Sequence, residues 1–158
     1  MLRFVCAAVA CCAFACGGSN SPQTVFNGSM KGSSETPPTS STATGTAKFT
    51  LSGTTMTWTE SSTPLAGTLS GFHIHLDATP GSPGPIVVSL TSQVTQAGDG
   101  STTGSGSFTA PDATAKNADG TPMTFDSLVA AMRAGQTYVN LHDTPGFRGG
   151  EIRGQLGP

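Results

Sequence analysis

The sequence predicts an all-β protein, an antiparallel β-sandwich or barrel of about eight short strands built from two related units. Apolar or β-branched residues alternate with polar ones in short segments, and a two-residue period is typical of strands with one buried face. Glycine, proline, serine and asparagine separate these segments, as they do in turns. The expected strands cover residues 25–30, 44–51, 54–60, 67–76, 85–90, 104–110, 137–142 and 151–156.

The second and third segments form the clearest local unit. They flank Ser52-Gly53-Thr54, so we expect a hairpin at this turn. Trp58 lies in the third segment among alternating threonines, and we expect its side chain to pack in the core or on a sheet face.

One segment breaks the two-residue period. In TFDSLVAAMRAG the apolar residues recur at helical intervals of three and four, at Phe125, Leu128, Val129 and Met132. We therefore expect one short helix near 125–134, capped by Thr124 and closed by Gly135. Such a helix would cover an end or an edge of the sheets.

Residues 1–15 have the features of an export signal. Arg3 is followed by an apolar run that is too short to span a bilayer. The sequence Ala13-Phe14-Ala15-Cys16 resembles the lipobox of bacterial lipoproteins, in which the cysteine is lipidated. We expect a flexible tether over 16–24 and one domain over 25–158.

This amino terminus indicates the location of the protein. Lipidation of Cys16 would give an exported, membrane-anchored lipoprotein. Its expected location is the outer membrane or the periplasm. Ala13 and Ala15 also form an ordinary cleavage site, and the protein would be secreted if Cys16 is not lipidated.

Charge and cysteine content exclude several classes of function. Lys and Arg number 7 against 9 Asp and Glu, and no basic stripe exists to bind nucleic acid. All four cysteines lie between residues 6 and 16, so the domain holds neither a disulfide nor a cysteine-based metal site. No G-x-S-x-G, Walker or dinucleotide motif is present, and no enzymatic activity is expected.

All three histidines lie just before one of two copies of a short sequence motif. His73 and His75 precede a Thr-Pro-Gly-x-x-Gly sequence at 79–84, and His142 precedes the same pattern at 144–149. This decayed repeat predicts two related β-units. Because alternate residues of a strand share a face, His73 and His75 point the same way, and His142 can join them from a neighbouring strand.

The polar faces of three expected strands would then form one patch. If segments 67–76, 137–142 and 151–156 are neighbours, this patch contains His73, His75, Asn140, His142, Glu151 and Arg153.

Two interpretations of the patch remain open. His73, His75 and His142 form a three-histidine set suited to copper or zinc with one open position. Alternatively, Glu151 and Arg153 orient the imidazoles in a hydrogen-bonded network that fixes strand register without a ligand.

The segment Gly71-Phe-His-Ile-His75 resembles the copper-binding strand of copper–zinc superoxide dismutases. Those enzymes use further histidines and a disulfide. The chain has only 3 histidines, and its cysteines precede the domain, so a dismutase is not expected.

Five segments in order resemble the CHRD domain, a module of chordin and of many exported bacterial proteins. They are residues 26–38, TGTAKFTL at 44–51, GFHIHL at 71–76, TYVNLH at 137–142 and GGEIRGQL at 149–156. The resemblance extends from Val25 to Leu156 and implies an extracytoplasmic β-domain. It assigns no mechanism, and Glu35 in its first motif is expected to be a solvated loop carboxylate.

The expected function is therefore a non-enzymatic binding or structural module at the cell envelope. Its lipid anchor would bind the membrane, and its further partner would be an extracytoplasmic protein or polysaccharide that the sequence does not identify. The alternative is a copper- or zinc-binding protein that uses the three histidines.

Overall fold

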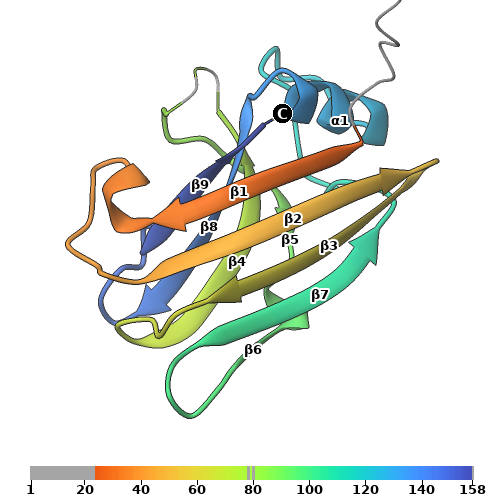
Figure 1. Cartoon of the computed structure of the whole chain (residues 1–158). Helices are drawn as coiled ribbons and strands as arrows, with labels where there is room; N and C mark the ends of the chain where they lie inside the picture. Colours follow the sequence, from red (N-terminus) through yellow and green to blue (C-terminus); the bar gives the residue numbers. More distant parts are fainter. Residues whose placement is uncertain (1–23, 78, 80, 158) are drawn as a thin grey trace, which may run out of the picture.

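The computed structural model describes residues 24–77, 79 and 81–157. In this part the chain forms one antiparallel sheet of nine strands, curled into a half-barrel, with a short α-helix at one end (Figure 1). The predicted export signal, Cys16 and the tether up to residue 23 lie outside the described residues. None of the described helices has the length and apolar character needed to cross a membrane.

The strands follow the chain with two short 3-10 turns and the helix between them. They are β1 (Val25–Lys31), β2 (Thr44–Ser52), β3 (Thr55–Ser62), β4 (Thr68–Leu76), β5 (Ile86–Ser89), β6 (Val94–Gln96), β7 (Thr102–Phe108), β8 (Thr137–Thr144) and β9 (Ile152–Leu156). The turns are η1 (Gly32–Ser34) and η2 (Thr91–Gln93), and the helix is α1 (Phe125–Arg133). The order across the sheet is β5-β4-β8-β9-β1-β2-β3-β7-β6.

The predicted fold class is confirmed, and all eight predicted strands are present within a few residues of their expected bounds. The ninth, β6, was not predicted because it has only three residues and follows η2 directly. The described strands belong to one continuous curled sheet rather than to two stacked sheets. The origin from two related units stays a prediction.

Local signals placed the hairpin and the helix correctly. Gly53 adopts a φ of 58° between β2 and β3, a conformation that glycine tolerates best. The Thr124 side chain accepts a hydrogen bond from the Ser127 backbone N–H, which caps α1. Gly135 follows the helix with a φ of 66°, as expected for a glycine that ends a helix.

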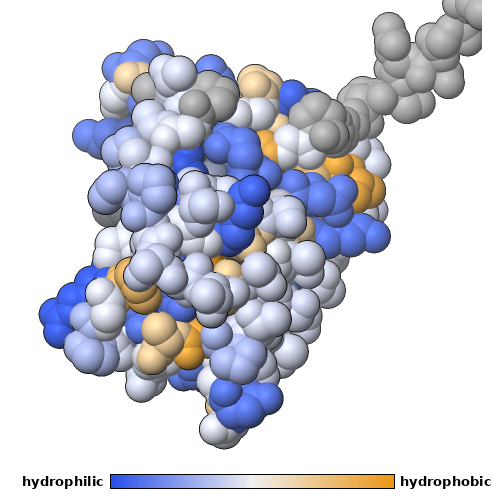
Figure 2. Space-filling model, turned by 60° about the vertical axis from the view of Figure 1, so that its left-hand side comes forward, coloured by the Kyte–Doolittle hydropathy of each residue, from blue (hydrophilic) through white to orange (hydrophobic). Residues whose placement is uncertain are grey.

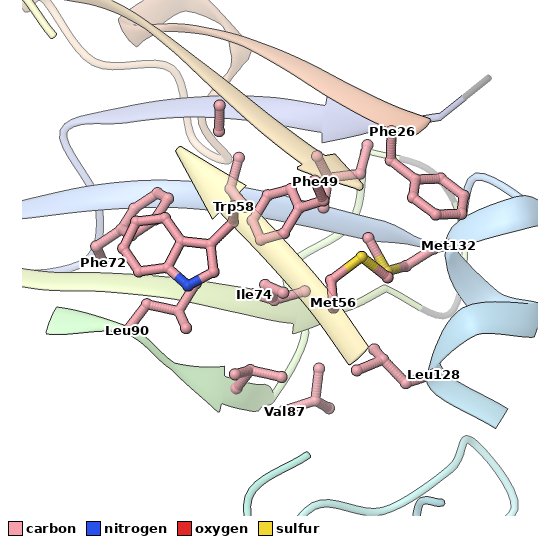
Figure 3. Packing of buried hydrophobic residues seen from close by; sticks show 14 of the residues in the cluster. Phe26, Phe49, Met56, Trp58, Phe72, Ile74, Val87, Leu90, Leu128 and Met132 are labelled. Atoms are coloured by element: carbon pink, nitrogen blue, oxygen red, sulfur yellow. The ribbon is translucent and has the colours of Figure 1, made fainter. Parts of the chain in front are cut away.

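The core fills the inside of the half-barrel and extends under α1 (Figure 3). Trp58 is buried, as predicted, and its ring lies 5.5 Å from that of Phe72. Leu128 and Met132 of α1 face Met56 across the end of the half-barrel (Figure 3). The helix therefore covers an end of the sheet, as its amphipathic pattern indicated.

Side chains of η2 and β6, at one edge of the sheet, form hydrogen bonds with the backbone at and just before β4. The Leu69 backbone N–H donates to Gln96 Oε1 at 2.9 Å, and Gln96 Nε2 donates to the Gly67 carbonyl at 2.9 Å. The Phe72 backbone N–H donates to Thr91 Oγ1 at 3.0 Å. These bonds satisfy backbone groups of β4 and of Gly67, which directly precedes it.

The surface is polar to neutral over most of the face in Figure 2, with small and separate hydrophobic areas. Among the described residues, Ile86 is the large hydrophobic side chain that stands exposed, at 43%. This face therefore offers no extended apolar patch for a partner.

Candidate functional site

The structure brings all three histidines together on the outer face of the sheet. β4 and β8 are antiparallel neighbours, with His73 opposite Asn140 and Gly71 opposite His142. Phe72 and Ile74 point to the core, so His73 and His75 point away from it. One ring nitrogen from each histidine lies within 4.8 Å of the others.

Gly71 makes room for this cluster. A Cβ at position 71 would lie 2.5 Å from Cε1 of His73 and 3.1 Å from Cδ2 of His142. Any larger residue would push the His73 ring out of its place. The glycine of the GFHIH segment is therefore explained by the packing of two imidazoles against the β4 backbone.

Backbone carbonyls fix the protonation of two rings. His75 Nδ1 lies 2.8 Å from the Gly84 carbonyl, and His142 Nδ1 lies 2.9 Å from the Arg148 carbonyl. Because a carbonyl only accepts, each Nδ1 carries the proton, and each Nε2 of a neutral ring keeps a free lone pair. Position 84 requires glycine because a Cβ there would lie 1.7 Å from the Leu76 carbonyl oxygen.

Two ring nitrogens of the cluster are buried without a hydrogen-bond partner among the described residues. They are His73 Nδ1 and His75 Nε2. The other nitrogen of His73, Nε2, lies 3.3 Å from Thr91 Oγ1, which leaves Nδ1 as the lone-pair atom when Nε2 donates. Each of these rings thus presents an unpaired atom inside the protein.

The surroundings keep the imidazoles neutral. Burial is the main cause that lowers the pKa of His73 to about 4, and the neighbouring His142 and His75 contribute to the same shift. Burial also lowers the pKa values of His75 and His142, although the Gly84 and Arg148 carbonyls act in the opposite direction. Neutral imidazoles are the form that binds transition metals.

A stack of rings supports His75 from the side of β9. The Tyr138 ring lies parallel to the His75 ring, with a centroid distance of 4.7 Å and an angle of 8°. The Arg153 guanidinium carbon lies 3.3 Å from the Tyr138 centroid, and Arg153 Nη2 lies 3.2 Å from Asp77 Oδ2 in a buried ion pair. Arg153 therefore belongs to the predicted patch and contacts the cluster through Tyr138.

Asn140 connects the cluster to a buried carboxyl group. Its Oδ1 lies 3.0 Å from His142 Nε2, and its Nδ2 lies 3.5 Å from Glu35 Oε1. Glu35 is only 7% exposed, so the prediction of a solvated loop carboxylate was wrong. Burial raises the pKa of Glu35, although Asn140 and Arg153 counteract this effect.

Glu151 does not join the histidines. It precedes β9, and its Oε1 accepts hydrogen bonds from Ser41 Oγ at 2.6 Å and from the Ala66 backbone N–H at 2.9 Å. Because Glu151 lies outside the strand, the alternation of β9 does not set the direction of its side chain. The carboxylate holds two loops together instead.

Sequence reasoning missed three members of the site. Asp77 and Tyr138 continue the polar alternation of β4 and β8, and that alternation was the signal that could have included them. Glu35 lies in a loop before β2, where no period shows which way a side chain points.

The cluster has the donor atoms of a metal site. A tetrahedral metal with bonds of about 2.0–2.1 Å to nitrogen separates its ligand atoms by about 3.4 Å. Nitrogens within 4.8 Å of one another need shifts of only about 1 Å each to reach that separation. Three neutral imidazoles with this spacing suit copper or zinc.

The fold and the cluster define an antiparallel β half-barrel with a histidine site on its outer face. The chain matches the CHRD domain over residues 26–156 and belongs to this family. The match runs from the second residue of β1 to the end of β9 and includes every residue of the histidine cluster. No curated protein and no solved structure matches the chain.

Proposed function

We propose that the protein is an exported, lipid-anchored CHRD-domain protein that acts as a non-enzymatic binding module at the cell envelope. The amino-terminal sequence is the observation that carries this proposal. A short apolar run ends at Ala15-Cys16, and a stretch rich in Gly and Ser separates Cys16 from β1. Membership of the CHRD family supports a binding domain after this tether.

Anchoring is tested with a single pair of variants in a bacterial host. Cys16→Ser removes the lipidated residue, and Cys12→Ser removes a neighbouring cysteine of the same segment as a matched control. The unchanged protein and Cys12→Ser should incorporate labelled fatty acid and sediment with membranes, whereas Cys16→Ser should do neither. Fatty-acid labelling of Cys16→Ser at the level of the control would refute the lipid anchor.

A second candidate function is metal binding, and the convergence of the three imidazoles favours it. One ring nitrogen from each of His73, His75 and His142 lies within 4.8 Å of the others, and burial keeps the rings neutral. The ligand would be copper or zinc, held by three nitrogen donors. In this case the metal is the ligand, or part of the ligand, of the binding module.

Metal binding is tested in the full chain with its four cysteines replaced by serine, so that thiolates do not compete. The chain has only 3 histidines, so His75→Ala and His142→Ala each remove a third of its imidazoles, all of which lie in the cluster. The parent and the control Asn117→Ala should bind one equivalent of Zn²⁺ or Cu²⁺, and both histidine variants should lose it. Equal metal content in all four proteins would reject the site and favour the hydrogen-bonded network.

A further inference from the structure

The pairing of donors and acceptors around His142 leaves two lone pairs facing each other. His142 Nδ1 donates to the Arg148 carbonyl at 2.9 Å, so Nε2 of the neutral ring has no proton. Asn140 Oδ1 lies 3.0 Å from it. An amide oxygen is also an acceptor, so neither atom supplies the hydrogen for a bond between them.

The direction of the Asn140 amide follows from its other neighbour. Asn140 is 2% exposed, and its Nδ2 donates to Glu35 Oε1 at 3.5 Å. This contact turns Oδ1 away from Glu35 and toward the histidines. Asn140 also lies directly opposite His73 in the register of β4 and β8, so its side chain points to the same face of the sheet.

We propose that Asn140 Oδ1 is the fourth ligand of a divalent transition-metal ion bound by His73, His75 and His142. This inference rests on the proposed metal-binding function. Two ligand atoms of one metal, each about 2.1 Å from it, lie about 3.0–3.4 Å apart. The separation of 3.0 Å between Asn140 Oδ1 and His142 Nε2 falls in that range.

This ligand completes the coordination sphere. Together with the unpaired atoms His73 Nδ1 and His75 Nε2, it gives three nitrogen donors and one oxygen donor. Zinc prefers four ligands, and an amide oxygen is a harder donor than imidazole, so the set favours an ion with a charge of +2. Glu35 is a positioning residue here, because it holds the Asn140 amide by accepting a hydrogen bond from Nδ2.

The test compares variants of the cysteine-free full chain with Zn²⁺ and Co²⁺ as probes. Asn140→Leu removes the oxygen donor, and Asn140→Asp replaces it with a carboxylate of the same shape. Asn27→Asp adds the same charge on the exposed face of β1 and serves as the matched control. Zn²⁺ affinity is measured by competition with a chromophoric chelator, and the visible absorption of bound Co²⁺ reports its ligands.

Asn140→Leu should weaken Zn²⁺ binding about tenfold or more, and Asn140→Asp should strengthen it. Asn140→Asp should also shift the visible bands of bound Co²⁺, because a ligand atom has changed, whereas Asn27→Asp should leave them in place. Unchanged Zn²⁺ affinity in Asn140→Leu, or unshifted bands in Asn140→Asp, would overturn the proposal. If the parent itself binds neither ion, the metal-binding function fails instead. If Asn140→Leu does not fold, the Co²⁺ spectrum of Asn140→Asp decides alone.

Discussion

Gly71→Ala perturbs the histidine cluster without removing a donor atom. The added Cβ would lie 2.5 Å from Cε1 of His73, closer than two carbon atoms can approach. Carbon atoms in contact settle about 3.5–4.0 Å apart, so the His73 ring must retreat by about 1 Å. The contact of 3.1 Å with Cδ2 of His142 limits the directions in which the cluster can adjust.

Two measurable effects follow from this displacement. Overpacking of a buried position costs about 1–3 kcal/mol of unfolding free energy. The three imidazoles must converge on one ion, so an added displacement of the His73 ring by about 1 Å should weaken Zn²⁺ binding about 10- to 100-fold. The backbone conformation adds no strain, because Gly71 has no positive φ.

The assay pairs chemical unfolding, followed by the fluorescence of Trp58, with a Zn²⁺ titration of the same sample. Gly98→Ala is the matched control, because a Cβ at position 98 would meet no atom within 4 Å. Gly98→Ala should behave like the parent in both measurements. The reasoning is refuted if Gly71→Ala equals Gly98→Ala in stability and in affinity, since the Cβ would then displace nothing.

Three further predictions concern stability. Burial lowers the pKa of His73 to about 4, whereas the unfolded chain titrates near 6.5, so protonation of the unfolded chain destabilises the protein as the pH falls between these values. The unfolding free energy should therefore fall between about pH 7.5 and pH 4. His73→Gln should make this fall smaller by about 1–2 kcal/mol, a figure reduced to allow for solvent screening of the half-buried ring. Arg153→Met leaves Asp77 buried without its cation and should cost about 3–5 kcal/mol in urea unfolding, of which the double variant with Asp77→Leu should recover part. Trp58→Ala should cost about 3–5 kcal/mol, followed by circular dichroism because the chain has 1 tryptophan.

The strands and the histidine cluster could be predicted from the sequence because apolar and polar residues alternate clearly in β4 and β8. Each of these strands has one apolar face in the core, and the direction of every polar side chain follows from the period. The motif that follows both β4 and β8 suggested that the two segments are related, and the structure pairs these strands side by side. The pairing of β4 with β8, and the common face of their polar side chains, bring His73, His75 and His142 together.

Strand β7 shows why other parts were harder to predict. Two of its inward positions are Gly104 and Gly106, where an added side chain would meet Val94, Gln93 and the Trp58 indole. A Cβ at Gly104 would lie 3.0 Å from Trp58 Cζ3, and one at Gly106 would lie 3.2 Å from Trp58 Nε1. The apolar partner of β7 therefore comes from β3, and the strand carries little hydrophobic alternation of its own.

Loop residues were the other difficulty. Glu35 and Glu151 are both buried, although each stands outside the strands, where no period applies. Contacts between segments far apart in the chain fix their places, such as Ser41 with Glu151 and Asn140 with Glu35. A pattern within one segment carries no information about such contacts, so neither burial nor partner could be read from the sequence.

The two interpretations of the polar face differ in how they account for unpaired nitrogens. An unpaired buried acceptor costs about 1–3 kcal/mol, and the described residues also bear this cost outside the cluster, at Glu60 Oε2 and Glu151 Oε2 among others. His73 Nδ1 and His75 Nε2 have no partner among the described residues, while Gly84 and Thr91 hold the opposite nitrogens of the same rings. The fold thus orients each ring through one nitrogen and leaves the other buried and unpaired. In the metal-binding proposal, a cation would coordinate both unpaired atoms and so remove their cost.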